Sequence, residues 1–228
     1  MKRGKFIVLE GTDASGKATQ LEILKKRLRE KSFSAKTLDF PRYYETAWGE
    51  FIGRYLKGEF GDPQKINPYL SFLPYMLDQL LAKPLITRWV GEGKIVLSNR
   101  YFTSNFAHQA GKLPPRKRKK FREFLKKAGY KELKLYQPDL VLVLYVPHKI
   151  AMKLNLKKSQ RKYIKGRKRD LVERHQIYQE ESVKEYLKVC REEDNWVLIK
   201  CCDDFDMLKT PQEIHEIIYK ILRGRKII

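Results

Sequence analysis

The sequence predicts an α/β protein in three layers, with a five-stranded parallel sheet and helices on both of its faces. Two observations predict this architecture. Short apolar runs typical of strands alternate along the chain with longer segments whose apolar residues recur at helical spacing. A glycine-containing loop follows the first of these runs and leads directly into the first helical segment.

Apolar runs predict the strands, and residues that stop or start a strand bound several of them. The runs are residues 5–10, 35–40, 94–98, 140–146 and 195–200. Pro41 ends the second run, and the turn at 91–93 precedes the third. The fourth run is continuously apolar, as expected for a parallel strand that is covered on both faces.

Helices are expected between these strands. Leu21, Leu24 and Leu28 recur at helical spacing after the glycine-containing loop. A second helical stretch covers residues 68–90, where Pro74 and Pro84 predict an offset start and a kink.

Two more helix starts have a chemical signature. Thr210 offers an N-cap, Pro211 suits the first helical position, and Glu213 can close a capping box. Asp170 and Glu173 repeat the cap spacing at the end of a strongly basic segment. That segment is therefore expected to form a mobile basic loop, or lid, at about 156–169 between helices.

Length and composition favour one domain over residues 1–228, because 42% hydrophobic residues can bury one sizeable core. No apolar run is long enough to cross a membrane, and the first residues run straight into a strand without the apolar stretch of a signal peptide. We therefore expect a cytoplasmic protein with no membrane partner.

The charge is strongly positive, at +22 from 49 Lys and Arg against 27 Asp and Glu. Such a field attracts phosphate groups on a nucleotide or on a nucleic acid, and it does not choose between them. One basic cluster lies at 116–122 and a second at 157–169. The first is interpreted either as a solvated surface or as a nucleic-acid contact.

The loop after the first strand fits the phosphate-binding pattern G-x-x-x-x-G-K, and its place between a strand and a helix indicates a P-loop NTPase fold. Its glycines let successive N–H groups face a phosphate, and Lys17 can reach the β and γ oxygens. The residues expected to contact ATP are Gly11, Thr12, Asp13, Ala14, Ser15, Gly16, Lys17, Ala18 and Thr19.

This pattern departs from the usual one in a single position. Ala18 stands where a Ser or Thr hydroxyl normally meets Mg²⁺, and Thr19 follows one place later. Either Thr19 binds phosphate while Mg²⁺ is held mainly through waters and substrate phosphates, or the site is weakened.

Along nearly its whole length the chain resembles thymidylate kinases. The matching segments occur in the family's order: LEGTDASGKATQ, DFPR, the helix with SFLPYMLDQ, LSNRYFTSNFAHQ, QPDLVLVLYV, and a basic loop that ends in DLVE. The resemblance implies transfer of the γ-phosphoryl group of ATP to dTMP, giving dTDP and ADP, by a protein that is commonly a homodimer.

The resemblance also assigns roles around the phosphates. It implies that Asp13 orients the sugar hydroxyl and the attacking phosphate, and that Arg42 and Arg100 bind the acceptor phosphate. A guanidinium suits that task because its fork grips phosphate oxygens. With Lys17 on the donor, Asp13 and Arg100 are expected catalytic residues.

By the same resemblance, Tyr75 stacks on the base, and Asn105 and Gln109 contact its edge. Gln79 stands where the family usually has an arginine, and His108 where it commonly has Tyr or Phe near the sugar. Both departures put strict preference for thymine and deoxyribose in question.

The family places its catalytic arginine either in the phosphate loop or in the lid. The loop position is Ala14 here, so the lid is expected to supply the arginine. Arg161 is the first choice, and Arg167 and Arg169 are the other candidates.

The resemblance implies Mg²⁺ as the cofactor, but Asn99 stands where the family has an aspartate. We therefore expect Mg²⁺ to be bound chiefly by nucleotide phosphates and water, with Asn99 nearby. Such changes should slow phosphoryl transfer before abolishing it, because this reaction depends mostly on positioning and electrostatics.

Two alternatives stay open at this point. One is the same chemistry on another pyrimidine nucleoside monophosphate, suggested by Gln79 and His108. The other is a catalytically weakened P-loop protein that binds nucleic acid through its basic surface, suggested by Ala18, Asn99 and the cluster at 116–122.

Overall fold

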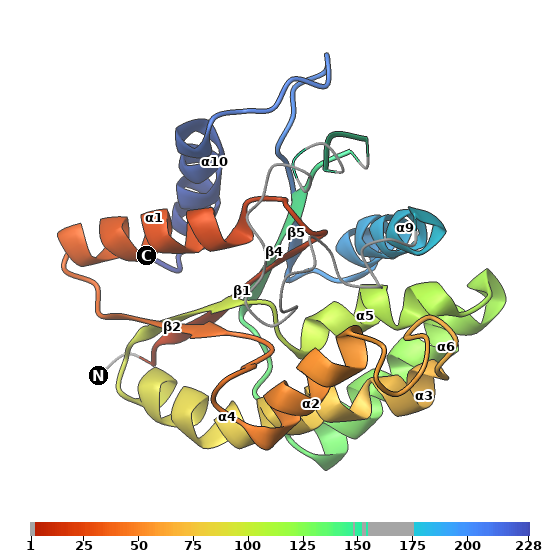
Figure 1. The fold of residues 1–228 in the computed structure, drawn as a ribbon. Helices are drawn as coiled ribbons and strands as arrows, with labels where there is room; N and C mark the ends of the chain where they lie inside the picture. The colour runs from red at the N-terminus through yellow and green to blue at the C-terminus, as the bar shows by residue number, and fades with distance from the viewer. Residues whose placement is uncertain (1–2, 148, 152–153, 155–175) are drawn as a thin grey trace.

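A computed structural model describes residues 3–147, 149–151, 154 and 176–228. Five parallel strands form one sheet in the order β2-β3-β1-β4-β5, which confirms the predicted sheet (Figure 1). The strands are β1 (Lys5–Gly11), β2 (Ala35–Asp39), β3 (Ile95–Asn99), β4 (Leu140–Tyr145) and β5 (Trp196–Lys200). Each lies within one residue of its predicted bounds at either end.

The side chains of β1 alternate between two hydrophobic clusters, as the period of a strand requires. Phe6 and Val8 enter one cluster, and Ile7 and Leu9 enter the other. Helices α1 (Lys17–Glu30) and α10 (Pro211–Gly224) cover the face of Ile7 and Leu9. Helices α4 (Leu73–Gly91) and α9 (Gln176–Glu192) pack on the other face, so the architecture has three layers (Figure 1).

Shorter elements build up the side of the molecule that carries α4. They are α2 (Ala47–Leu56), α3 (Pro68–Ser71), the 3-10 turns Phe102–Ser104 and Ala110–Lys112, α5 (Asn105–His108), α6 (Pro115–Leu125), and the π-helical segment Lys126–Glu132. Because α5 follows β3 through one of these turns, it lies directly beside the carboxyl end of the sheet (Figure 1).

The predicted helix starts agree well with the structure where it describes them. Thr210 caps α10, Pro211 begins it, and Glu213 closes the capping box. The stretch 68–90 is divided into α3 and α4, with Pro74 in the first turn of α4 and Pro84 inside it. The basic lid at 156–169 and the helix start at Asp170 lie outside the described residues.

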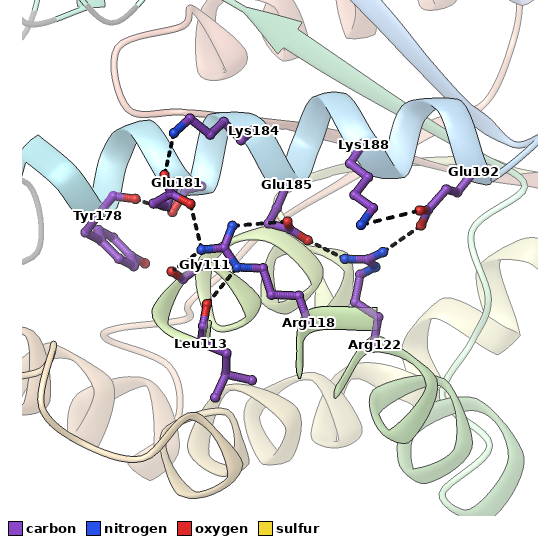
Figure 2. Close-up of polar contacts among 11 residues, drawn as sticks. Gly111, Leu113, Arg118, Arg122, Tyr178, Glu181, Lys184, Glu185, Lys188 and Glu192 are labelled. Atoms are coloured by element: carbon purple, nitrogen blue, oxygen red, sulfur yellow. Dashed lines mark hydrogen bonds and ion pairs between the residues drawn. The ribbon is translucent and has the colours of Figure 1, made fainter. Parts of the chain in front are cut away.

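The basic cluster at 116–122 is only partly a surface. Arg118 and Arg122, one helical turn apart on α6, are 5% and 4% exposed. Figure 2 shows both guanidinium groups reaching toward carboxylates of α9, where Arg118 binds Glu181 and Glu185, and Arg122 binds Glu185 and Glu192. The cluster is therefore an amphipathic helix with two cations facing inward, which weakens the interpretation of all its cations as a nucleic-acid contact.

Candidate active site

The loop between β1 and α1 has the curled backbone that its glycines predict. Gly11 has a φ of 134°, and a Cβ there would lie 2.3 Å from the carbonyl oxygen of Leu144. Gly16, before the first turn of α1, has a φ of 88°. Ala14 also adopts the left-handed region, with a φ of 61°, in which a side chain is disfavoured. Strain of this kind is typical of binding loops.

Lys17 lies folded into this loop and is only 7% exposed. Its Nζ donates to the carbonyl oxygens of Gly11 and Thr12, at 3.1 and 2.7 Å, and to Ser15 Oγ at 3.3 Å. The ammonium group is thereby held at the N-terminus of α1, where the helix dipole favours an anion.

A cavity opens beside the loop, between α2, α4, α5 and the start of α9. It brings together seven of the eight residues predicted to bind the acceptor: Asp13, Tyr75, Gln79, Arg100, Asn105, His108 and Gln109. The rest of its wall is Phe40, Pro41, Tyr43, Tyr55, Leu56, Tyr101, Ser104, Lys112 and Tyr178. Apolar and aromatic walls with a few placed polar groups are typical of small-molecule sites.

Arg100 connects this cavity to the phosphate loop. It follows β3 with a φ of 61°, and its guanidinium lies 2.7 Å from Asp13 Oδ1 and 2.9 Å from His108 Nε2. Because a guanidinium can only donate, His108 Nε2 accepts and the ring proton sits on Nδ1, facing Tyr178 Oη at 3.1 Å. Burial, with the nearby charge of Arg100, lowers the pKa of His108 to about 3, so the ring is neutral.

Arg42 is the one residue, of the eight predicted to bind the acceptor, that does not line this cavity. Its Nε and backbone N–H bind the carboxylate of Asp78, at 3.1 and 3.0 Å, and Thr46 Oγ1 donates to the same carboxylate at 2.7 Å. The side chain lines a neighbouring cavity with Ala18 and Asn99. Asp78 was not anticipated from the sequence, although an acid inside an apolar helical run is itself a signal.

Glu10 bonds to Tyr101 and Ser104 in the wall of this cavity, which is called the acceptor cavity after its predicted ligand, and was also not anticipated. It is fully buried at the end of β1 and accepts hydrogen bonds from Tyr101 N, Thr103 Oγ1, Ser104 Oγ and Tyr186 Oη. These bonds fix the turn from β3 into α5. A buried carboxylate needs such partners, and a charged residue at the end of an apolar strand was its only sequence signal.

Three side-chain amides, those of Gln79, Asn105 and Gln109, line the cavity. Asn105 Nδ2 donates to the carbonyl of Phe102 at 3.0 Å, and Gln109 Oε1 accepts from Ser71 Oγ at 2.6 Å. Gln79 Oε1 is buried and has no hydrogen-bond partner among the described residues. Tyr75 lies edge-on to Tyr55 with ring centroids 6.4 Å apart. A buried acceptor of this kind can take a donor from water or from a ligand.

On the other side of the loop, β2 and β3 end in a register pair of polar residues, Asp39 and Asn99. Asn99 Nδ2 donates to Asp39 Oδ1 at 2.8 Å. Asn99 Oδ1 is buried without a partner in the part of the chain that the structure describes. Both side chains line the cavity that contains Ala18. Asp39 is therefore a further candidate that sequence reasoning did not single out.

The lid arginines Arg161, Arg167 and Arg169 lie outside the described residues. Across the described residues, no three His, Cys, Asp or Glu side chains gather in a group that could hold a metal ion. Nor does any helix within these residues have the length and apolar character needed to cross a membrane.

Comparison with known proteins places this geometry in a family. A sequence profile described as thymidylate kinase matches residues 9–209. The chain is 30% identical to a thymidylate kinase of Mycobacterium tuberculosis over 169 residues, covering 74% of this chain and 78% of the relative. It is 28% identical to one of Thermosipho africanus over 96% of this chain and all of the relative.

A solved structure of thymidylate kinase from Candida albicans has the same fold. It superposes with a TM-score of 0.76 at 20% sequence identity, over 99% of this chain and 93% of that one.

Proposed function

This chain belongs to the thymidylate kinase family, and we propose that its described site transfers the γ-phosphoryl group of ATP to dTMP, giving dTDP and ADP. One observation carries the assignment of the site. Asp13 belongs to the phosphate loop, and its carboxylate lies 2.7 Å from Arg100 in the acceptor cavity. The donor loop and the acceptor cavity therefore share a wall, as direct transfer between two bound nucleotides requires.

On the donor side, Lys17 would exchange its three contacts within the loop for the β and γ oxygens of ATP. These contacts keep the ammonium group within the phosphate loop before the nucleotide arrives. An oxygen of the acceptor phosphate attacks the γ phosphorus while the bond to the bridging β–γ oxygen breaks. Lys17 and Arg100 supply positive charge where negative charge develops.

On the acceptor side, we propose that Arg42 and Arg100 hold the phosphate, with Asp13 beside the sugar. Asp78 fixes the guanidinium of Arg42, which leaves it rigid. Tyr75 would stack on the base, with Gln79, Asn105 and Gln109 at its edge. His108, held neutral beside Arg100, would face the sugar.

Mg²⁺ is proposed as the cofactor, and the residues at the ends of β2 and β3 fit it. Magnesium prefers oxygen ligands and keeps several waters. Ala18 offers no oxygen, whereas Asp39 offers a carboxylate and Asn99 an unsatisfied carbonyl oxygen. When bound, the ion would neutralise charge on the nucleotide phosphates. We propose that Asp39 stands in for the missing hydroxyl, contacting the ion's waters.

Binding of Mn²⁺ to the ADP complex, followed by electron paramagnetic resonance, tests the role of Asp39. Asp39→Asn should weaken Mn²⁺ binding roughly tenfold or more. Glu45→Gln, on the wall of the same cavity, is the matched control and should leave binding near the wild-type value. Equal Mn²⁺ affinity in both variants would show that Asp39 does not serve the ion.

Three further features remain proposals. Arg161, with Arg167 and Arg169 as alternatives, would bring positive charge to the γ-phosphate from the lid, as an arginine finger does. The protein is proposed to act as a homodimer. Gln79 and His108 keep a related pyrimidine acceptor open as the second candidate.

Release of ADP with dTMP, dUMP, dCMP, UMP and CMP as acceptors, in a Mg²⁺ titration, tests the function directly. We expect dTMP to have the highest kcat/KM. A ribonucleotide that is preferred over every deoxynucleotide would assign the chain a different acceptor, and no turnover with any acceptor would contradict kinase activity.

A further inference from the structure

Lys112 is a hydrogen-bonded cation in the wall of the acceptor cavity. Its Nζ donates to Tyr55 Oη at 3.0 Å, to the carbonyl oxygen of Pro63 at 2.8 Å, and to Ser71 Oγ at 3.2 Å. An ammonium group has three donors and no acceptor, so these three bonds use all of its hydrogens. Tyr55 in turn donates its own proton to Pro63, at 3.0 Å.

These bonds fix the direction of the next one. Because Ser71 Oγ accepts from Lys112, its single proton is free to be donated, and the recipient at 2.6 Å is the side chain of Gln109. Only the carbonyl oxygen of an amide can accept, so Gln109 must turn Oε1 toward Ser71. Its Nε2, an obligate donor, is then left for a ligand.

Asn105 has the opposite orientation for a comparable reason. Its Nδ2 donates to the backbone carbonyl of Phe102, which leaves Oδ1 as the acceptor. Together, Gln109 and Asn105 offer one donor and one acceptor. A 4-oxopyrimidine has an acceptor at C4 and a donor at N3, and a 4-aminopyrimidine has the reverse. Two buried amides of fixed orientation therefore discriminate between these bases.

We propose that Lys112 is a positioning residue that sets the base specificity of this site: acting through Ser71, it locks the Gln109 amide as a donor to the 4-oxo group. This inference rests on the proposed function, because it requires the base of the acceptor nucleotide to occupy the cavity. Without the cation, Ser71 is free to accept from Gln109, the amide can turn over, and a 4-amino group is no longer rejected.

The surroundings of Lys112 add a dependence on pH. Burial lowers the pKa of Lys112 to about 7, against the opposing charge of Asp62. Tyr55, whose pKa is raised by burial, and neutral His108 are the other titratable groups that face it. Above this pH the neutral amine can accept from Ser71, which releases Gln109. Discrimination against a 4-amino base should therefore decline as the pH rises through about 7.

The test compares dTMP with 5-methyl-dCMP, which differ only in the 4-oxo and 4-amino edge. We expect Lys112→Met and Ser71→Ala each to lower the ratio of their kcat/KM values about fivefold or more. Lys120→Met, on the exposed side of α6, is the matched control and should keep the wild-type ratio. In wild-type protein the ratio should fall between about pH 6 and pH 8.5, and in Lys112→Met it should not change with pH.

The outcomes separate this inference from the proposed function. No turnover of dTMP by the wild-type protein would contradict the function itself. Turnover of dTMP with a wild-type ratio in Ser71→Ala would overturn the role of Lys112, including where Lys112→Met does not fold. A pH dependence that persists in Lys112→Met would also overturn it.

Discussion

Two pairs of arginines in this protein differ in burial and have opposite purposes: Arg118 and Arg122 are buried, whereas Arg42 and Arg100 are partly exposed. Arg118 and Arg122 lie between α6 and α9, where three glutamates of one helix surround them (Figure 2). Arg118 also donates to the backbone carbonyl of Leu113 at 2.7 Å. In this first pair, charge is matched by charge within the protein, and the helices are joined without any ligand.

The second pair, Arg42 and Arg100, lies at the carboxyl ends of β2 and β3. Arg42 binds Asp78, and Arg100 binds Asp13 and His108. Around them the structure leaves several polar atoms unsatisfied among the described residues, namely Thr12 Oγ1, Gln79 Oε1 and Asn99 Oδ1. Burial of an arginine therefore does not identify a site. A concentration of incompletely satisfied polar groups beside it does.

The largest expected effect is the loss of Lys17, because it removes charge from the donor phosphates. Lys17→Ala should lower kcat about 10²- to 10³-fold, measured by ADP release with saturating dTMP. The exposed Lys26 on the same helix is the control, and Lys26→Ala should retain normal turnover. A variant of Lys17 with more than a tenth of the wild-type kcat would break the assignment of the phosphate loop.

The next effect is on stability and belongs to the first arginine pair. Arg122→Met removes the cation between Glu185 and Glu192, and should lower the free energy of unfolding by about 3 kcal/mol, measured in urea. The KM for dTMP should not change at temperatures where the variant is folded. Lys119→Met, exposed on α6, should change stability by less than about 0.5 kcal/mol. A raised KM for dTMP in Arg122→Met would show that the first pair also serves the acceptor site, and not the fold alone.

For Arg100 we expect the opposite of Arg122: a change in KM with little change in stability. The effect should also be smaller. Arg100→Lys keeps a cation beside Asp13 and loses the fork that grips phosphate, so the KM for dTMP should rise roughly tenfold. The free energy of unfolding should stay within about 1 kcal/mol of wild type. Steady-state kinetics measures the change in KM, and urea unfolding of the same preparation measures the change in stability. Loss of stability with an unchanged KM would show that Arg100 acts like Arg118 and Arg122, in the fold and not in binding.

The effect that is smallest near neutral pH concerns His108, which Arg100 and burial keep neutral. Its pKa is about 3 in the folded protein, below the ordinary 6.5. As the pH falls, His108 is therefore protonated in the unfolded chain at a higher pH than in the folded protein. Stability should therefore be complete above pH 6.5 and decline as the pH falls toward 3, by at most about 1.4 kcal/mol per pH unit. Unfolding in urea between about pH 6 and pH 4 should show a shallower decline in His108→Phe. An identical slope would mean that His108 is not buried as a neutral ring.

Periodicity was sufficient to predict the sheet, and a short motif predicted the phosphate loop, whereas the residues expected to bind the acceptor came from the resemblance to thymidylate kinases. The strands follow from apolar runs, and Thr210 follows from a capping pattern three residues long. Arg100, Asn105 and His108 stand in one contiguous segment, LSNRYFTSNFAHQ, and the roles expected for them came from its resemblance to thymidylate kinases. All of these signals are local in sequence.

What the tertiary structure alone decided depends on contacts between distant residues. Nothing within 116–122 says that Arg122 faces inward, because its partner Glu192 is 70 residues away. Asp39 meets Asn99 across 60 residues, through the register of two strands. Lys112 reaches Tyr55 and Ser71 only because α2, α3 and the turn Ala110–Lys112 come together in the fold. The amino-acid sequence by itself determined which chemical groups are present and which local elements carry them. Their pairing was decided by packing, because the burial and partner of a charge are properties of the whole fold.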